Sequence, residues 1–215
     1  MRVNPLYSQE KQLSVYGQLS GFRNKSLTND LMIKSDIGLS LFNDFWISPF
    51  FGFSYLSAQQ EDTTLENALP QPITLSTQNL NLQFSTLQTG IKIRLIEQDS
   101  NVWPIVQTTL QFGQAKATAT QFILEEEPDL LRQEFRSETK ESVIYPVFSL
   151  GIESTPFGSE TVNLSVLLSY TILDVPEMAD KIKTELPEDS GFTGDLSSIG
   201  LTLALKYTFL RKKEL

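Results

Sequence analysis

The feature that most constrains the fold is a strict alternation near the end of the sequence, in residues 198–209. Every second residue there is large and apolar, as at Leu201, Leu203 and Leu205, and the residues between them are small or polar. A period of two puts all the apolar side chains on one face of a β-strand, whereas a helix would scatter them. This stretch is longer than the usual strand of a globular sheet and suits a strand that crosses a bilayer at a tilt. It therefore predicts an amphipathic, membrane-crossing strand.

The same alternation recurs in earlier stretches and predicts an all-β protein with eight strands. The apolar phase slips at Ser85-Thr86, which indicates one extra residue, a β-bulge, and Pro49 indicates a second bulge or local break. Short and long connections alternate along the chain, as in an antiparallel up-and-down barrel with its long loops at one end. The seven further predicted strands are residues 13–21, 33–41, 46–55, 80–95, 102–113, 144–153 and 162–172.

The chemistry of the two strand faces indicates which face meets lipid. One face carries Ser, Thr, Gln and Gly with few charges, which suits the narrow interior of an eight-stranded barrel. The other face is almost free of charge, as lipid requires. Apolar residues make up 40% of the chain and no long apolar run occurs, so a transmembrane helix is not expected. A soluble lipocalin-like barrel, with its apolar face inside and a bound ligand, remains the alternative.

The last strand, which closes on Phe209, resembles the C-terminal strand of bacterial outer-membrane β-barrels. By its strand pattern, the chain resembles the small eight-stranded members of that family. The resemblance implies a transmembrane barrel in the bacterial outer membrane, in contact with the lipid bilayer and lipopolysaccharide, with short periplasmic turns and long extracellular loops. It divides the chain into an N-terminal tail (1–11), the barrel (12–209) and a periplasmic C-terminal tail (210–215).

Two features at the ends of the sequence depart from that family pattern. Most members stop at the terminal aromatic, whereas a basic segment including Arg211, Lys212 and Lys213 follows here. It is either a solvated tail or a point of contact with another envelope protein. No secretion signal precedes the first strand, so for an exported barrel we expect the numbering to describe a mature or recombinant chain.

Composition excludes several functions. The chain has no His and no Cys, which removes the Ser-His-Asp triad, histidine metal ligation, disulfides and thiolate metal sites. The outer-membrane lipid A deacylase and palmitoyltransferase, which are similar in size, depend on a catalytic His. We therefore expect no enzyme activity, no metal and no cofactor. The net charge of −9, without a basic stripe, argues against nucleic acid as a partner.

Charged residues on the predicted inward face form the first candidate site. Buried charges must pair, because an unpaired ion inside a protein costs several kcal/mol. All of them fall toward the short-turn half of their strands, so we expect a salt-bridge network that blocks passage there, with a proton or ion path as the alternative. The residues are Lys34, Asp36, Lys92, Arg94, Glu153 and Lys206.

Aromatic residues near the predicted short turns form the second candidate site, an interfacial girdle. By strict alternation Trp46 and Trp103 fall on the inward face, so they either begin their strands out of phase or plug the periplasmic mouth. Ordinary packing at the barrel end is the simpler alternative. The girdle residues are Phe42, Phe45, Trp46, Trp103, Phe157, Tyr207 and Phe209.

The long connections at 58–78, 115–142 and 173–196 carry the acidity of the chain, and the last one contains a possible short helix at 176–186. The function expected from these features is a structural or surface-interaction role through acidic extracellular loops. A narrow channel or transporter for small or apolar solutes is the alternative. It would need a lateral opening, for which Pro49, Pro104 and Pro146 are the candidate positions.

Overall fold

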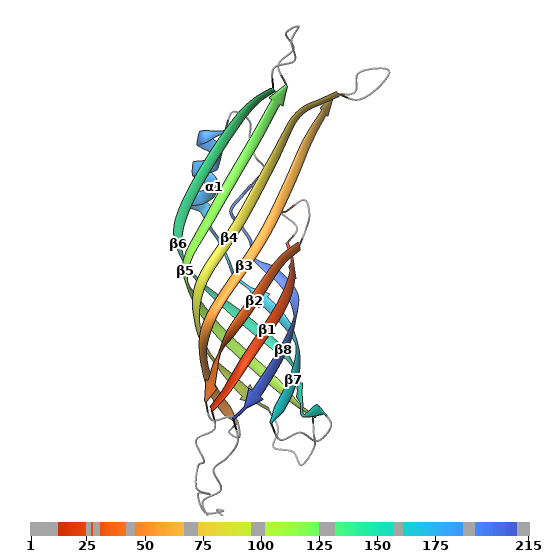
Figure 1. Cartoon of the computed structure of the whole chain (residues 1–215), viewed down its shortest axis with the longest axis vertical. Coiled ribbons are helices and arrows are strands. Elements are labelled where there is room, and N and C mark those ends of the chain that lie inside the picture. The colour runs from red at the N-terminus through yellow and green to blue at the C-terminus, as the bar shows by residue number, and fades with distance from the viewer. Residues whose placement is uncertain are drawn as a thin grey trace, which may run out of the picture.

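In its computed structural model, the protein is a closed barrel of eight antiparallel strands arranged in sequence order (Figure 1). Each strand pairs with the next, and β1 pairs with β8 to complete the ring. The predicted eight-stranded up-and-down barrel is confirmed. The strands are β1 (Leu13–Arg23), β2 (Leu31–Leu41), β3 (Ile47–Glu66), β4 (Ile73–Arg94), β5 (Val102–Leu124), β6 (Arg132–Ser154), β7 (Val162–Thr171) and β8 (Ser198–Thr208), with one helix, α1 (Pro176–Glu185), between β7 and β8.

The structure describes residues 13–24, 27, 31–41, 46–66, 73–95, 102–124, 132–156, 161–186 and 192–209. Both predicted tails lie outside these residues. The start of β1 and the end of β8 lie side by side, since Ser14 pairs with Thr208. We call this end of the barrel the base and the opposite end the mouth. No helix among the described residues is long and apolar enough to cross a membrane.

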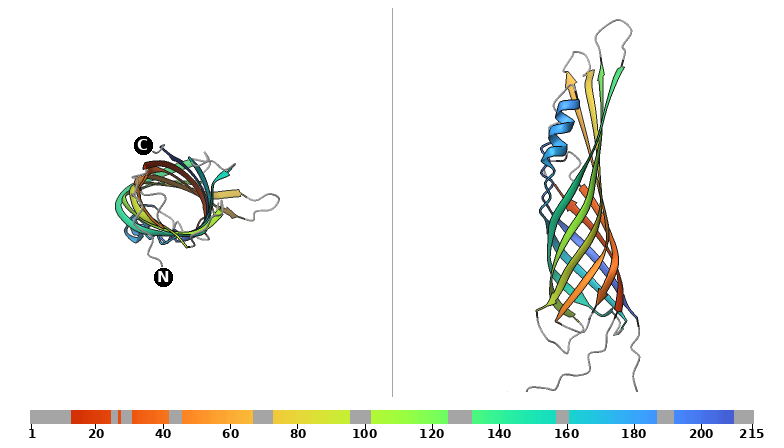
Figure 2. Two further views of the ribbon diagram at one scale, coloured as in Figure 1. Left: turned by 90° about the horizontal axis from the view of Figure 1, so that it is seen from below. Right: turned by 90° about the vertical axis from the view of Figure 1, so that its left-hand side faces the viewer.

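The strands fall into two length classes, which gives the barrel an uneven rim. Strands β1, β2, β7 and β8 have 10 or 11 residues, whereas β3 to β6 have 20 to 23. Beyond the ring the four long strands continue together as a curved sheet (Figures 1 and 2). We call this part the extension; it comprises residues 57–66, 73–85, 114–124 and 132–142. The predicted loops at 58–78 and 115–142 are therefore largely strand, which corrects those assignments.

The apolar phase slip at Ser85-Thr86 is not a β-bulge. Tyr55 pairs with Ser85 and Ser54 with Thr86, and the register with β5 also runs unbroken through this point. The slip arises because the apolar residues change face: Leu87 points outward, whereas Phe84 and Leu82 point inward and are buried. The register shift between β3 and β4 lies instead at Thr64/Leu65.

The three prolines proposed as positions of a lateral opening do not interrupt the strand pairing of the barrel wall. Pro49 pairs with Ile91, and Pro104 with Ile152, in continuous register. Pro146 pairs with Leu110 on β5, while the pairing of β6 with β7 begins one residue later, at Val147. The missing N–H of Pro146 therefore falls where the β7 neighbour ends, a position that proline tolerates. The bulge expected at Pro49 is absent.

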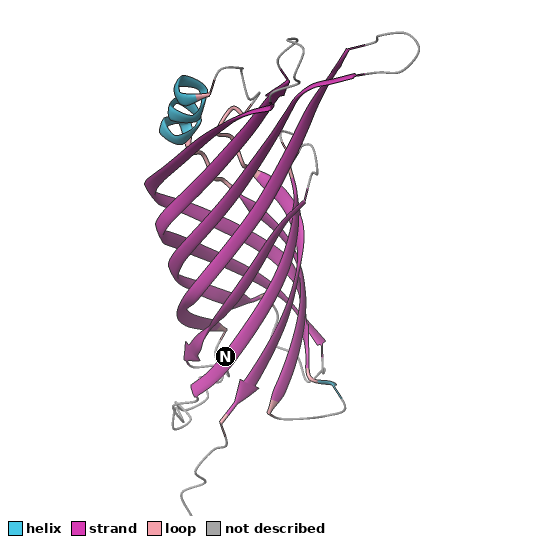
Figure 3. Ribbon diagram, turned by 45° about the horizontal axis from the view of Figure 1, so that its top comes forward, coloured by secondary structure: helices cyan, strands magenta, loops and turns pink. Residues whose placement is uncertain are grey.

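The connection between β7 and β8 folds back over the mouth. Leu173 and Leu196 are joined by a backbone hydrogen bond of 2.8 Å, and Val175 and Gly194 by one of 2.9 Å. Gly194 has a φ of 86°, which a residue with a side chain rarely adopts. From this ladder the chain leads into α1, which lies beside the upper part of the strands (Figure 3). Its buried residues share one cluster with inward residues of the extension. The helix predicted over residues 176–186 is confirmed.

Candidate functional site

The outer surface of the ring is apolar and exposed on every strand. Leu203, in the middle of β8, leaves 54% of its surface accessible and lies between Leu19 of β1 and Val166 of β7. A patch of this extent is unfavourable in water and matches the lipid-facing surface of a barrel that spans a bilayer. A soluble lipocalin-like barrel would have its apolar face inside, so these outward side chains contradict that alternative. We call this surface the apolar band.

The band ends where the extension begins. On β6 the outward residues change from Ile144, which is 75% exposed, to Ser142 and Lys140. On β5 they change from Phe112 to Gln114. The extension therefore presents a polar outer face, as expected for the part of a strand that has left the bilayer.

The structure describes only some residues of the predicted aromatic girdle. Trp46 is 62% exposed, so it is not packed inside the base, where the strict alternation assigned it. Tyr207 and Phe209 also point outward and contact each other edge to face, with ring centroids 5.7 Å apart. Trp103 differs, because it lies beneath the Arg94 guanidinium at 4.4 Å, on the inward side. The remaining members, Phe42, Phe45 and Phe157, lie outside the described residues.

Sequence reasoning missed a second set of outward aromatics on the mouth side of the band. Tyr55, Phe112 and Tyr170 are all exposed on the outer face near the point where their strands leave the band. Each lies near the end of an alternating apolar stretch of the sequence, and this position could have identified it as an interfacial aromatic. These positions are typical of aromatics at a membrane interface.

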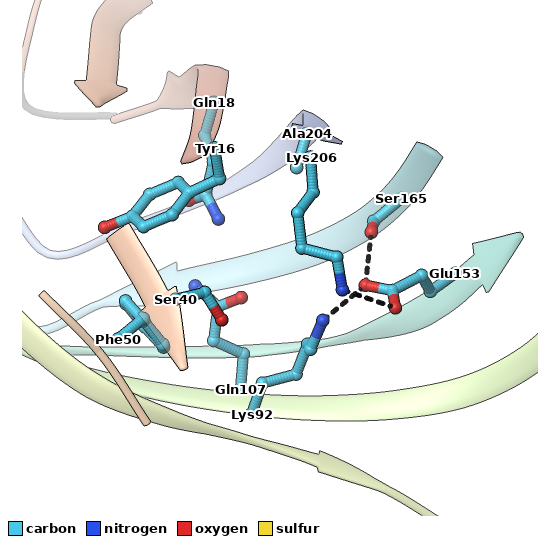
Figure 4. Close-up of a pocket in the computed structure, with 10 residues that line it drawn as sticks. All are labelled: Tyr16, Gln18, Ser40, Phe50, Lys92, Gln107, Glu153, Ser165, Ala204 and Lys206. Carbon is cyan, nitrogen blue, oxygen red and sulfur yellow. Dashed lines mark hydrogen bonds and ion pairs between the residues drawn. The ribbon is translucent and has the colours of Figure 1, made fainter. Parts of the chain in front are cut away.

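Near the base, the lumen contains a cluster of charges around one carboxylate (Figure 4). Lys92 donates to Oε2 of Glu153 at 2.6 Å, and Lys206 donates to its Oε1 at 3.2 Å. Arg94 Nη2 also reaches Oε1, at 3.1 Å. The Glu153 side chain is 2% exposed, and it accepts further hydrogen bonds from Ser165 and Asn163. Strands β4, β6, β7 and β8 therefore meet at this carboxylate.

Lys34 and Asp36 do not join that cluster, which corrects the expectation of one network near the short turns. They form their own ion pair of 2.6 Å along β2, and both side chains are buried. Lys34 pairs with Ser20 and Leu56, in the half of β2 that lies nearer the mouth. The sequence places both residues inward, but their distance from Glu153 depends on the tilt of the strands.

Above the charged cluster, aromatic rings cross the lumen because facing strands carry glycine. The Tyr16 ring meets that of Phe50 edge to face at 5.6 Å. A Cβ added at Gly38 or Gly52 would lie 2.5 or 2.7 Å from the Tyr16 hydroxyl, and one added at Gly90 would lie 2.5 Å from Phe50. These glycines make the space that the two rings fill.

A chain of side-chain hydrogen bonds continues from Tyr16 across the lumen. Gln88 donates to the Tyr16 hydroxyl at 2.8 Å, Gln111 donates to Gln88 at 2.9 Å, and Thr86 donates to Gln111 at 2.7 Å. On the opposite wall a second chain of 2.8 Å contacts links Ser149, Ser169, Thr202 and Ser20. The hydroxyl and amide groups of these two chains thereby find hydrogen-bond partners away from bulk water.

The mouth is filled by an apolar core instead. The buried residues Met178 and Ile182 of α1 pack with Phe84 and with Ala117 of the extension. Phe192 and Leu196 complete the cover from the chain that returns to β8. The lumen is therefore filled by polar side chains below and by apolar ones above.

Helix α1 is held to β6 through carboxylates at both of its ends. Glu141 of β6 accepts a hydrogen bond of 3.1 Å from the backbone N–H of Met178, in the first turn of the helix. No side chain of the helix's own cap makes this contact. At the other end Ser137 donates to Glu185 at 2.5 Å. The extension thus supplies both contacts that position the helix.

Glu141 lies in an environment that disfavours its charge. Burial raises its pKa above the ordinary value, and the nearby carboxylates of Glu177 and Asp174 act in the same direction. The hydrogen bond from Met178 lowers the pKa but does not outweigh them. On the outer face of the same strand, the hydrogen bond from Lys116 lowers the pKa of Glu138.

No group of residues in the described part of the chain has the arrangement of a metal site.

No family model matches the sequence, and no curated protein sequence matches it. Solved structures with a related arrangement include Neisserial surface protein A, with 10% identity, a TM-score of 0.47, and coverage of 93% of this chain and 97% of that one. The N-terminal β-barrel domain of Pseudomonas aeruginosa OprF has 10% identity, a TM-score of 0.39, and coverage of 93% and 99%. A de novo designed transmembrane β-barrel has 11% identity, a TM-score of 0.39, and coverage of 92% and 95%. These values are too low to transfer a function from any of the three proteins.

Proposed function

We propose that this protein is a non-enzymatic barrel of the bacterial outer membrane that holds a protein surface outside the bilayer and does not conduct. The observation that carries the proposal is the extension: four strands leave the apolar band together, and their outer face is polar. A water-filled pore would not need a lumen filled along its length, nor a helix packed into the mouth. The narrow-channel alternative gains no support from the strand pairing at Pro49 and Pro104.

The expected acidic character of this surface needs revision. On the outer face of the extension, described charges of both signs lie close together, and Lys116 and Glu138 form an exposed ion pair of 3.0 Å. Arg136 and Lys140 are also exposed there. The most acidic stretch, residues 125–129, lies outside the described residues. The surface we propose for partner contact is therefore mixed in charge.

Lipopolysaccharide is the partner that this position favours, in addition to the bilayer itself. Lys140 lies on β6 a few residues beyond Ile144, where the band ends, and Lys116 lies at a similar place on β5 beyond Phe112. Cations immediately outside a membrane attract anionic head groups. Arg136→Gln combined with Lys140→Gln should reduce the stabilisation that lipopolysaccharide gives to the barrel in vesicles. Equal stabilisation of wild type and variant would contradict this assignment.

Cysteine labelling in intact cells tests the orientation and the exposed surface. The chain has no Cys, so single substitutions report without background. A maleimide that cannot cross membranes should label Gln114→Cys on the extension, whereas Trp46→Cys at the base should react only after the cells are permeabilised. The opposite labelling pattern would overturn the proposed orientation.

Conductance in planar bilayers tests the closed lumen. The purified protein should give no steady ionic current, because the Glu153 cluster, the rings of Tyr16 and Phe50, and the apolar core of the mouth lie one after another along the lumen. A steady current from the wild-type protein would favour the channel alternative and overturn the proposal.

A further inference from the structure

The charges of the described residues inside the ring do not balance. Below the apolar core, four described inward cations face two carboxylates when all are ionised, because Lys34 pairs with Asp36 while three cations share Glu153. The formal excess among these residues is two positive charges. Buried ions are tolerated when their charge is compensated nearby. Asp36 is already paired, so the uncompensated charge lies in the cluster around Glu153.

Glu153 cannot accommodate all the donors that surround it. A carboxylate offers about four lone-pair positions. Side chains of Lys92, Arg94 and Lys206 approach it, in addition to the two donors from β7. Each ammonium group carries three N–H donors, so donors remain that Glu153 cannot satisfy. Arg94 Nε is one of these: it is buried and has no hydrogen-bond partner among the described residues.

A small cavity lies beside the cluster (Figure 4). Its volume is about 30 Å³, and Lys92 and Lys206 line one side of it. Such a volume admits one or two water-sized particles and excludes a large organic ligand. Apart from Glu153, Lys92 and Lys206, the lining residues with polar side chains are hydroxyl and amide residues, which can turn a donor inward. They are Tyr16, Gln18, Ser40, Gln107 and Ser165.

From the excess charge and the adjacent cavity, we propose that the lumen binds a small monovalent anion of the size of chloride between Lys92 and Lys206. An anion offsets one of the uncompensated charges and accepts hydrogen bonds from the N–H groups of Lys92 and Lys206 that Glu153 leaves unused; Arg94 does not line the cavity. Water can fill the same volume but brings no charge. A metal cation would add to the excess. The site is separate from the extension, so the inference stands or falls independently of the proposed surface role.

Bromide can replace chloride as a probe, because it scatters X-rays anomalously. Crystals of the detergent-solubilised wild-type protein grown in sodium bromide should show an anomalous peak between Lys92 and Lys206. No peak in bromide would overturn the proposal, and this measurement does not depend on any variant folding.

Thermal unfolding gives a second, functional readout. At constant ionic strength, the unfolding midpoint of the wild-type barrel should be several degrees higher in chloride than in gluconate. Lys206→Met removes one excess charge and should abolish most of that difference. Lys183→Met, on the exposed side of α1, is the matched control and should retain it. If Lys206→Met and Lys183→Met respond alike, the site is not the source of the chloride effect.

Glu153→Gln provides a test in the opposite direction. It raises the excess positive charge without changing the side-chain size, so the variant should bind bromide at least several-fold more tightly than wild type. Its midpoint should depend more steeply on chloride concentration. A weaker dependence than that of wild type would contradict the proposal.

Discussion

Strands β3 to β6 run through two regions that use the same alternation in opposite ways. In the apolar band, Phe148 and Leu87 point outward and most inward side chains of these strands are polar. In the extension, apolar side chains such as Phe84 and Ala117 point inward toward α1, with buried polar ones such as Gln121 farther from the ring, and the outward side chains are polar. The backbone and the hydrogen-bonded register are continuous between the two. The difference teaches that the solvent outside, lipid or water, decides which face of a strand is apolar.

The largest contrast should come from removing one phenylalanine in each region. Phe84→Ala leaves a cavity in the packed core of the mouth and should lower the free energy of unfolding by about 3–5 kcal/mol. Phe148→Ala in the band should cost less, about 1.5–3 kcal/mol at most, because lipid chains fill the space and the transfer term alone is lost. Denaturant unfolding in vesicles measures both. Equal losses would mean that the two regions are packed in the same way.

A charge on the outer face tests the same comparison from outside. Leu203→Arg places a guanidinium in the middle of the band and should destabilise the inserted barrel by about 2–4 kcal/mol. Gln114→Arg on the outer face of the extension should change stability by no more than about 0.5 kcal/mol. Heat-modifiable migration on a detergent gel and unfolding in vesicles would check this pair. A large effect of Gln114→Arg would place that residue in lipid and move the boundary.

The chain that covers the mouth should be sensitive at Gly194. Its φ of 86° opposes a side chain, and so does the Val175 carbonyl oxygen, which would lie 2.8 Å from a Cβ at this position. Gly194→Ala should loosen the cover by about 1–3 kcal/mol. Faster proteolysis within residues 173–196, with the strands of the ring still protected, is the expected result. Gly17→Ala on β1 is the control, since the nearest atom there lies at 3.9 Å.

The smallest effect concerns pH and α1. Because the pKa of Glu141 is raised in the folded protein, its contribution to docking of the helix is fully present below the ordinary glutamate pKa, about 4.3, and is lost as the pH rises through the raised value. The protection factors of the α1 amides, which allow for the intrinsic pH dependence of exchange, should therefore fall over that range. Glu141→Gln should remove this pH dependence.

Glu138→Gln is the matched control for that experiment. Glu138 lies on the same strand but faces outward, and its pKa is lowered, not raised. Exchange in α1 should keep its wild-type pH dependence in this variant. Loss of the dependence in both variants would show that Glu141 is not its origin.

Much of the barrel could be predicted from the sequence because a period of two is a local signal. The alternation at Leu201, Leu203 and Leu205 identifies a strand and its apolar face without knowledge of any neighbour. The Met178, Ile182 and Leu186 spacing identified α1 in the same way. Inward charges such as Lys92 and Glu153 could be found because alternation assigns each side chain to a face.

Contacts between distant parts of the chain could not be predicted in this way. Lys206 reaches Glu153, whereas Lys34 pairs within its own strand, because strand tilt and register decide which inward residues share a height. Trp46 is largely exposed although the alternation assigned it inward, since it lies just before β3 begins.

The sequence by itself determined that the chain forms amphipathic strands, how many there are, and that one face of each is suited to lipid. Only the tertiary structure showed that β3 to β6 continue beyond the ends of the other four strands. It also showed that, beyond the band, the apolar residues of these long strands point inward and pack around α1. The phase slip at Ser85-Thr86 marks the position where the apolar residues change from the outward to the inward face. In the sequence alone, this slip cannot be distinguished from a β-bulge. The physical reason is that alternation is a property of the backbone, whereas the choice of buried face depends on what surrounds the closed barrel at each height.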